Sequence, residues 1–166
     1  MISSRGFVDD QRSDVSESDP PDAKVLFRVP GDDDSADVET LWASAMGDDH
    51  YRIDNSPFFA YSVSWLDVVY APFDDAEGFP TFQRVVTKSG NRTVRVMFED
   101  AVQPGNQSDR ILQGLLTLGC SYEGANSKFF SITVPPGIDL DAVRQYLIEE
   151  HATFEHADPT YDELFS

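Results

Sequence analysis

The chain has 166 residues, of which 40% are hydrophobic, so it can bury a core and is not disordered throughout. Thirty acidic residues against 12 basic ones give a formal net charge of −18, which argues against nonspecific nucleic-acid binding and against a basic membrane-binding face. No apolar run approaches about 18 residues, the N-terminus lacks an apolar signal segment, and Cys120 is the single cysteine. We therefore expect a cytoplasmic protein with no membrane span and no internal disulfide.

The kinds of charged residue in the chain indicate the salt concentration in which the protein works. Most of the acidic residues are aspartates, and Lys24, Lys88 and Lys128 are the only lysines. Such a surface suits molar salt, where a Debye length of about 3 Å screens self-repulsion. We interpret the source as a salt-adapted microbe; an acidic protein from an ordinary microbe is the alternative.

The N-terminal third begins with an arm and a strand. Residues 1–23 are rich in Asp, Ser and Pro and are predicted to be a disordered acidic arm. Residues 24–29 alternate and are rich in strand formers, which predicts a first strand. Residues 34–47 are predicted to be a short helix, with Asp34 or Ser35 as its N-cap and a glycine at its end.

Strand signals dominate the following stretch. A second strand is predicted at 50–55, and two strand pieces are predicted around a tight corner at 64–67. Residues 81–100 read as a hairpin with Ser89-Gly90-Asn91 at its tip. Residues 24–100 are therefore predicted to form a β-rich subdomain, a small antiparallel sheet or partial barrel with one short helix.

The pattern changes in residues 101–158. A helix, a hairpin, a second helix and a last edge strand are predicted there, at residues 108–119, 120–136, 138–154 and 152–158. With the preceding strand, this order predicts a ferredoxin-like (split βαβ) second half and an α+β fold class overall. Residues 159–166 are predicted to be a loose tail.

Six short motifs occur in a recognisable order. They are LWA (41–43), YRIDNSPFF (51–59), DVV (67–69), SGNRTVRV (89–96), LGCSYE (118–123) and ITVPP (132–136). Together they resemble a bacterial and archaeal family called domain of unknown function 4265, over roughly residues 24–158. The resemblance implies the domain and supplies no mechanism. Two departures stand out: the family usually has Gly where this chain has Leu66, and often His where it has Asn91.

Asp67 is a candidate catalytic residue. A carboxylate among aromatic side chains can have a raised pKa and act as a general acid or base. The alternative is a structural role, because Asp at a tight corner commonly accepts hydrogen bonds from nearby backbone N–H groups. The corner favours the structural role.

Four cations flank the predicted hairpin tip: Arg84, Lys88, Arg92 and Arg95. They could form a binding site for a phosphate or carboxylate, together with the N–H groups around Gly90. The alternative is ordinary surface pairing with neighbouring acids.

Other chemistry-bearing residues form no motif. Cys120 follows a predicted helix end and is expected to be a buried structural thiol. The histidines and the aspartate clusters lack the spacing of metal ligands, so no metal and no cofactor is expected. The aromatic side chains of Phe59, Tyr61 and Trp65 are a candidate partner-binding face; the alternative is that the aromatic residues of this region belong to a core that also packs the C-terminal helices.

These features favour a non-catalytic binding or regulatory module. Its partner would be a protein, for example a toxin that the module neutralises, or a small anionic ligand. One alternative is a small enzyme that uses Asp67 with Arg84, Arg92 or Arg95. A further alternative is an RNA-binding regulator that uses the same basic hairpin.

Overall fold

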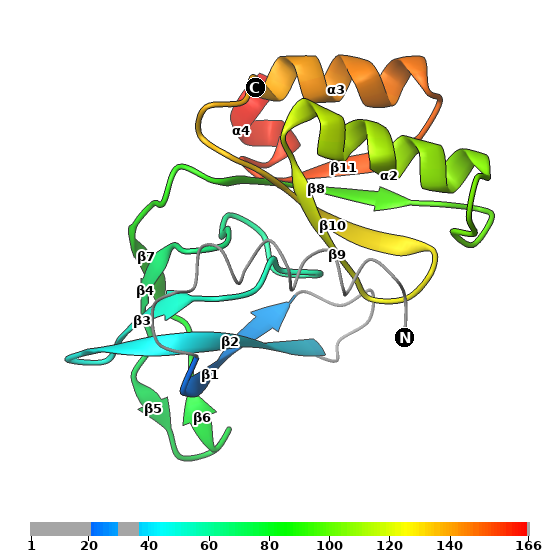
Figure 1. The fold of residues 1–166 in the computed structure, drawn as a ribbon. Helices are drawn as coiled ribbons and strands as arrows, with labels where there is room; N and C mark the ends of the chain where they lie inside the picture. Colours follow the sequence, from blue (N-terminus) through cyan, green and yellow to red (C-terminus); the bar gives the residue numbers. More distant parts are fainter. Residues whose placement is uncertain (1–20, 30–36, 166) are drawn as a thin grey trace.

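The computed structural model describes residues 21–29 and 37–165, which form mostly antiparallel β-sheets with a few short helices (Figure 1). The first sheet has the order β1-β2-β3-β4-β7. Its strands are β1 (Ala23–Val29), β2 (Asp37–Gly47), β3 (His50–Ile53), β4 (Val68–Tyr70) and β7 (Arg84–Thr87). A small ribbon of β5 (Phe73–Asp74) and β6 (Phe79–Pro80) lies beside it. The described part of the chain is α+β and contains no closed barrel, although Phe82 N donates to Leu26 O (2.8 Å) and curls the sheet back toward β1.

The second sheet has the order β11-β8-β10-β9. Its elements follow the chain as β8 (Arg92–Met97), α2 (Gln107–Leu118), β9 (Ser121–Gly124), β10 (Phe129–Val134), α3 (Leu140–Glu149) and β11 (Thr153–Asp158). Helices α2 and α3 cover one face of this sheet (Figure 1). Buried side chains such as Val96, Phe130 and Ile132 on the strands meet Leu115 and Leu147 on the helices and form the larger core.

The helix predicted at 34–47 is wrong. Residues 37–47 are strand β2, and the cap at 34–35 lies outside the described residues. Leu41 and Ala43 are buried while Trp42 between them is exposed, an alternation of period two. Pairing with all seven residues of β1 overrides the local helix signals, because propensity is weaker than tertiary context.

The hairpin predicted at 81–100 is also wrong. Strand β7 pairs with β4 in the first sheet, whereas β8 lies between β10 and β11 in the second. Both edges of β8 are therefore occupied, and no edge remains for β7. The chain crosses between the sheets at 88–91, where Gly90 has φ +94° and a Cβ would lie 2.9 Å from Pro136. Residues 92–97 thus belong to the second sheet, although the predicted β-rich subdomain included them.

Local signals in the second half are confirmed. Gly119 ends α2 in the left-handed region, and the Asp139 side chain caps α3. The N-cap of α2 is Asn106, two residues before the predicted start of this helix at 108, since its side chain accepts a bond from Asp109 N. The predicted tail contains the short helix α4 (Tyr161–Phe165), which begins with reciprocal bonds between Thr160 and Glu163.

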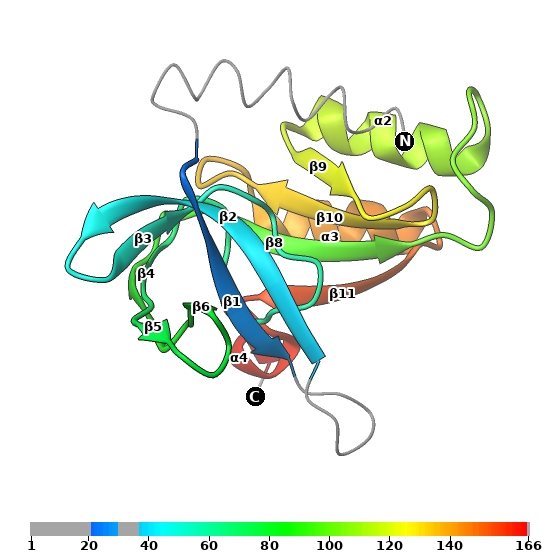
Figure 2. The same ribbon diagram turned by 90° about the horizontal axis from the view of Figure 1, so that it is seen from below.

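Residues 54–67, which we call the middle segment, run between the two sheets (Figures 1 and 2). The two strand pieces predicted around 64–67 reduce to β4, and 58–66 form no strand. The segment covers the second sheet on the face opposite the helices. That face is polar and buried: it carries Thr93, Arg95 and Ser131, among others. The layers are therefore first sheet, middle segment, second sheet and helices.

The backbone at Leu66 generates the first prediction. Leu66 has φ +71°, a region that costs an L-residue roughly 1–2 kcal/mol and glycine almost nothing. We expect Leu66→Gly to be more stable than Leu66→Ala by about 1 kcal/mol, because both remove the side chain and only Gly relieves the backbone. Urea unfolding of the two variants measures the difference. Equal stability, or a more stable Ala variant, would contradict the strain.

Candidate functional site

The buried peptide groups of the middle segment are bound by charged side chains. Arg95, which is fully buried, donates to Pro57 O (3.1 Å), Ala60 O (2.9 Å) and Phe59 O (3.3 Å). Its Nε donates to Glu155 (3.0 Å). These bonds matter because a buried carbonyl without a partner costs about as much as a lost hydrogen bond.

Glu39, on the first sheet, binds the backbone N–H groups of the same stretch of the middle segment. Its carboxylate accepts from Phe58 N (2.7 Å), Phe59 N (3.1 Å) and Ala60 N (2.9 Å). Arg95 and Glu39 therefore hold one stretch of backbone from opposite sheets.

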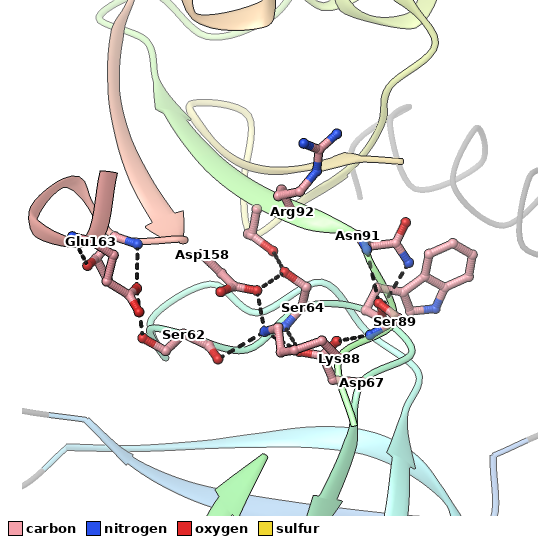
Figure 3. Close-up of polar contacts among 12 residues, drawn as sticks. Ser62, Ser64, Asp67, Lys88, Ser89, Asn91, Arg92, Asp158 and Glu163 are labelled. Atoms are coloured by element: carbon pink, nitrogen blue, oxygen red, sulfur yellow. Dashed lines mark hydrogen bonds and ion pairs between the residues drawn. The ribbon is translucent and has the colours of Figure 1, made fainter. Parts of the chain in front are cut away.

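Asp67 lies at the junction where the chain crosses between the sheets (Figure 3). Its side chain is fully buried and accepts from Ser64 N (2.8 Å), Ser89 N (2.7 Å) and Lys88 Nζ (2.7 Å). Lys88 Nζ also donates to Asp158 (2.6 Å) at the end of β11. One ammonium thus bridges two carboxylates from separate parts of the chain.

Ser64 completes this junction cluster, which comprises Ser64, Asp67, Lys88 and Asp158. Its hydroxyl lies 2.6 Å from Asp158 Oδ2, to which it donates, and 2.6 Å from the Thr93 hydroxyl. A serine beside a lysine and carboxylates resembles an activated nucleophile in composition. Here Ser64 is fully buried, so a substrate cannot reach it without displacing the middle segment.

Lys88 is a cation in this arrangement and not a base. Burial lowers the pKa of Lys88 more than any other single influence, but its hydrogen bonds to Asp158 and Asp67 outweigh it and raise the pKa above the ordinary 10.5. A general base would need a pKa near the operating pH. The junction cluster is therefore suited to holding the two sheets together.

The turn at residues 88–91 explains how Asn91 can stand where the family often has His. The Asn91 side chain donates to Trp65 O (2.9 Å), and the Ser89 hydroxyl donates to the same carbonyl (2.8 Å). A histidine ring N–H at position 91 could donate in the same way. The residue change from His to Asn therefore keeps a turn contact.

The four predicted anion-binding cations do not converge. Arg84 lies over the Tyr70 ring at 4.4 Å on the first sheet. Arg92 points away from Asp67 (Figure 3) and donates to Pro135 O (2.7 Å) and Ile138 O. Lys88 and Arg95 are held in the junction cluster and under the middle segment. Asp67 is likewise brought together with Lys88 and with none of the arginines.

Two of the three predicted aromatic residues are exposed. Phe59 is 52% exposed and its ring lies 5.7 Å from that of Phe129 on β10, while Tyr61 is also exposed above the Arg95 guanidinium (4.6 Å). Trp65 is half-buried and donates to Asp54 (3.1 Å). Sequence reasoning missed Met97, which is exposed directly opposite Phe129. We call Phe59, Tyr61, Met97 and Phe129 the aromatic rim.

Other sites are unremarkable within the described ranges. Burial raises the pKa of the Cys120 thiol to about 11, which makes it a poor nucleophile. Residues 21–29 and 37–165 contain no group of three or more acidic, His or Cys side chains that could hold a metal ion. In the same ranges, no helix has the length and apolar character needed to cross a bilayer.

The fold and junction define a two-sheet α+β protein with a buried connecting segment. Residues 39–156 match the family described as "Domain of unknown function (DUF4265)", and the chain belongs to that family. A solved structure, titled "Novel crystal structure of a hypothetical protein from Neisseria gonorrhoeae", is similar with a TM-score of 0.72 and 16% identity. The match covers 86% of this chain and 99% of that one, and it shows the fold alone. No curated protein matches the chain.

The junction cluster generates the second prediction. Replacing Lys88 by Gln leaves the buried carboxylates of Asp67 and Asp158 without their cation. We expect this change to destabilise the fold by about 2 kcal/mol, which is less than for a fully buried ion pair because the Lys88 side chain is half-exposed. Because the pKa of Lys88 is raised, its contribution is present at neutral pH and is lost as the pH rises above 10.5. Urea unfolding at neutral and alkaline pH measures both effects.

Lys128→Gln is the matched control, since Lys128 is exposed in the β9–β10 turn, and we expect it to change stability by less than about 0.5 kcal/mol. A Lys88 variant as stable as this control would contradict the role of the cluster.

Arg95 generates the third prediction. Arg95→Lys keeps the charge but cannot donate simultaneously to three carbonyls and Glu155, so we expect a loss of about 2–4 kcal/mol. Arg84→Lys, on an exposed face, is the control. Thermal and urea unfolding compare them, and similar losses in both variants would argue against the carbonyl clamp.

Proposed function

We propose that the protein is a non-catalytic binding module that contacts a basic protein partner through the aromatic rim. The observation that carries this proposal is the composition of the rim: Phe59 and Tyr61 of the middle segment and Met97 of β8 are exposed, and Phe129 of β10, in ring contact with Phe59, is part-buried. Aromatic residues and Met are enriched at protein interfaces. The rim also has a rigid base, because Arg95 holds the backbone of Phe59 beneath it.

Charge selects the kind of partner. The chain carries a net charge of −18, and the exposed acids Glu99 and Asp100 lie just after the end of β8 at Met97. A positively charged partner would complement such a surface at contact distance, since molar salt screens attraction over longer distances, and would meet apolar side chains at its centre. A small anionic ligand bound by Arg84, Lys88, Arg92 and Arg95 has less support than a protein partner, because these four cations are dispersed. The enzyme alternative likewise lacks an arginine near Asp67.

We further propose a ferredoxin-like second half and a salt-adapted cytoplasmic setting. The strand order β11-β8-β10-β9, with α2 and α3 on one face, supports the first. The acidic, lysine-poor composition supports the second.

The fourth prediction tests the aromatic rim. A photo-crosslinking amino acid placed at position 59 in cells should capture a basic protein that the same group at position 73 does not capture. Phe73 is a fair comparison because it is also an exposed phenylalanine, at 61%, on the small β5–β6 ribbon.

The captured protein is then purified and titrated with Phe59→Ser and Phe73→Ser. We expect Phe59→Ser to weaken binding at least about 10-fold, the effect of a loss above 1.4 kcal/mol, and Phe73→Ser to leave it unchanged. Association should also slow as salt rises. Equal capture at both positions, or equal affinity of both variants, would refute the proposal.

A further inference from the structure

A cavity of about 380 Å³ is lined by residues of β11, α3, α4 and the middle segment. Tyr61, Arg144, Glu155, His156 and Tyr161 line it, among others. A second cavity of about 170 Å³ shares Arg144 and His156 and is bounded by α4 as well. The larger volume is within the range of small-molecule sites.

His156 is the unusual residue of this cavity. Its side chain lies on the helix side of β11, and the residue is only 6% exposed. Its ring lies 5.8 Å from that of Phe154 and 6.1 Å from that of Phe165. Within the described residues, neither ring nitrogen has a hydrogen-bond partner. Buried polar groups are almost always paired, so this imidazole is an exception, although both of its ring nitrogens are buried and not exposed to the cavity.

The cation of the cavity is Arg144 on α3. Its guanidinium stacks over Phe165 at 5.0 Å, and its ion pair with Asp141 is long, at 3.9 Å. A guanidinium held against an aromatic ring offers its remaining N–H donors in the fork geometry that binds a carboxylate.

An anionic group lines the same cavity. Glu155 is half-exposed, and its carboxylate is fixed by Arg95 Nε (3.0 Å) and by the Tyr61 hydroxyl (2.9 Å). A carboxylate has about four lone-pair sites, so these two bonds leave room for an ammonium group. Asp162 adds a second acid to the lining. The cavity therefore contains a cationic group, acids, an unpaired imidazole and aromatic surfaces.

We propose that this cavity binds a free amino acid with an apolar side chain. Arg144 binds its carboxylate, Glu155 binds its ammonium, and Tyr61, Phe154 and Tyr161 contact its side chain. The His156 ring forms part of the cavity wall beside the bound ligand. The proposal does not depend on the aromatic rim as a partner site, although both include Tyr61.

His156 adds no positive charge to this wall at neutral pH. Burial, and then the charge of Arg144, lower the pKa of His156. The imidazole is therefore neutral at neutral pH and offers one donor and one acceptor. The charged groups around it are Arg144, Asp141, Glu155 and Asp162.

The test begins with the intact chain and the common L-amino acids, added singly at millimolar concentration in a thermal-shift assay. We expect those with apolar side chains to raise the unfolding midpoint. The strongest is then titrated by calorimetry beside two analogues, one lacking its amino group and one lacking its carboxylate. Both analogues should bind at least about 10-fold more weakly if the two charges are recognised. No shift with any amino acid, or analogues that bind equally well, would overturn the proposal.

Variants locate the site. Arg144→Gln should weaken binding at least about 10-fold, while Arg110→Gln, an arginine on α2 away from the cavity, should not. His156→Phe should raise the unfolding midpoint of the ligand-free protein, because it removes two unpaired polar atoms, and should leave an aromatic ring in the cavity wall. Phe59→Ser should leave amino-acid binding unchanged, which separates this site from the rim. Binding that is insensitive to Arg144→Gln would also overturn it.

Discussion

The fold depends on satisfying the peptide groups of an irregular segment buried between two sheets. Residues 54–67 leave the regular ladders, so other partners must bind their N–H and C=O groups. Glu39 from the first sheet and Arg95 from the second bind the same four-residue stretch. At the other end, Asp67 and Lys88 bind Ser64 N and Ser62 O. Because these side chains belong to different sheets, satisfying the segment also fixes the sheets relative to each other.

This constraint also decides which residues are left for function. Charged side chains that look catalytic or anion-binding in the sequence are used to hold backbone, and Ser64 and Asp67 are sealed from solvent. The outer edge of the middle segment remains available for binding, because its side chains face outward while its backbone is held rigid. The cavity beside α4 is different again, since His156 and Arg144 there have few internal partners. A surface and a cavity of these kinds are suited to binding.

The two departures from the family pattern have structural explanations. Position 66 requires a left-handed backbone, which glycine adopts freely and leucine adopts at a cost. Position 91 requires a side-chain donor to the Trp65 carbonyl, which either Asn or His supplies. Both positions lie next to the junction cluster, Leu66 directly before Asp67 and Asn91 bound to the Trp65 carbonyl.

The sequence by itself determined the features that arise from neighbouring residues. It specified α2 and α3 with the glycine and aspartate caps, the β9–β10 hairpin and the strand at β11, because capping and hydrophobic periodicity act over a few residues. The Thr160–Glu163 capping signal was equally local and could have predicted α4. Only the tertiary structure decided that residues 37–47 are a strand, that β7 and β8 join different sheets, and that Lys88 binds Asp158, 70 residues further along the chain. Those outcomes depend on which distant strand supplies the hydrogen bonds, and short-range patterns do not contain that information.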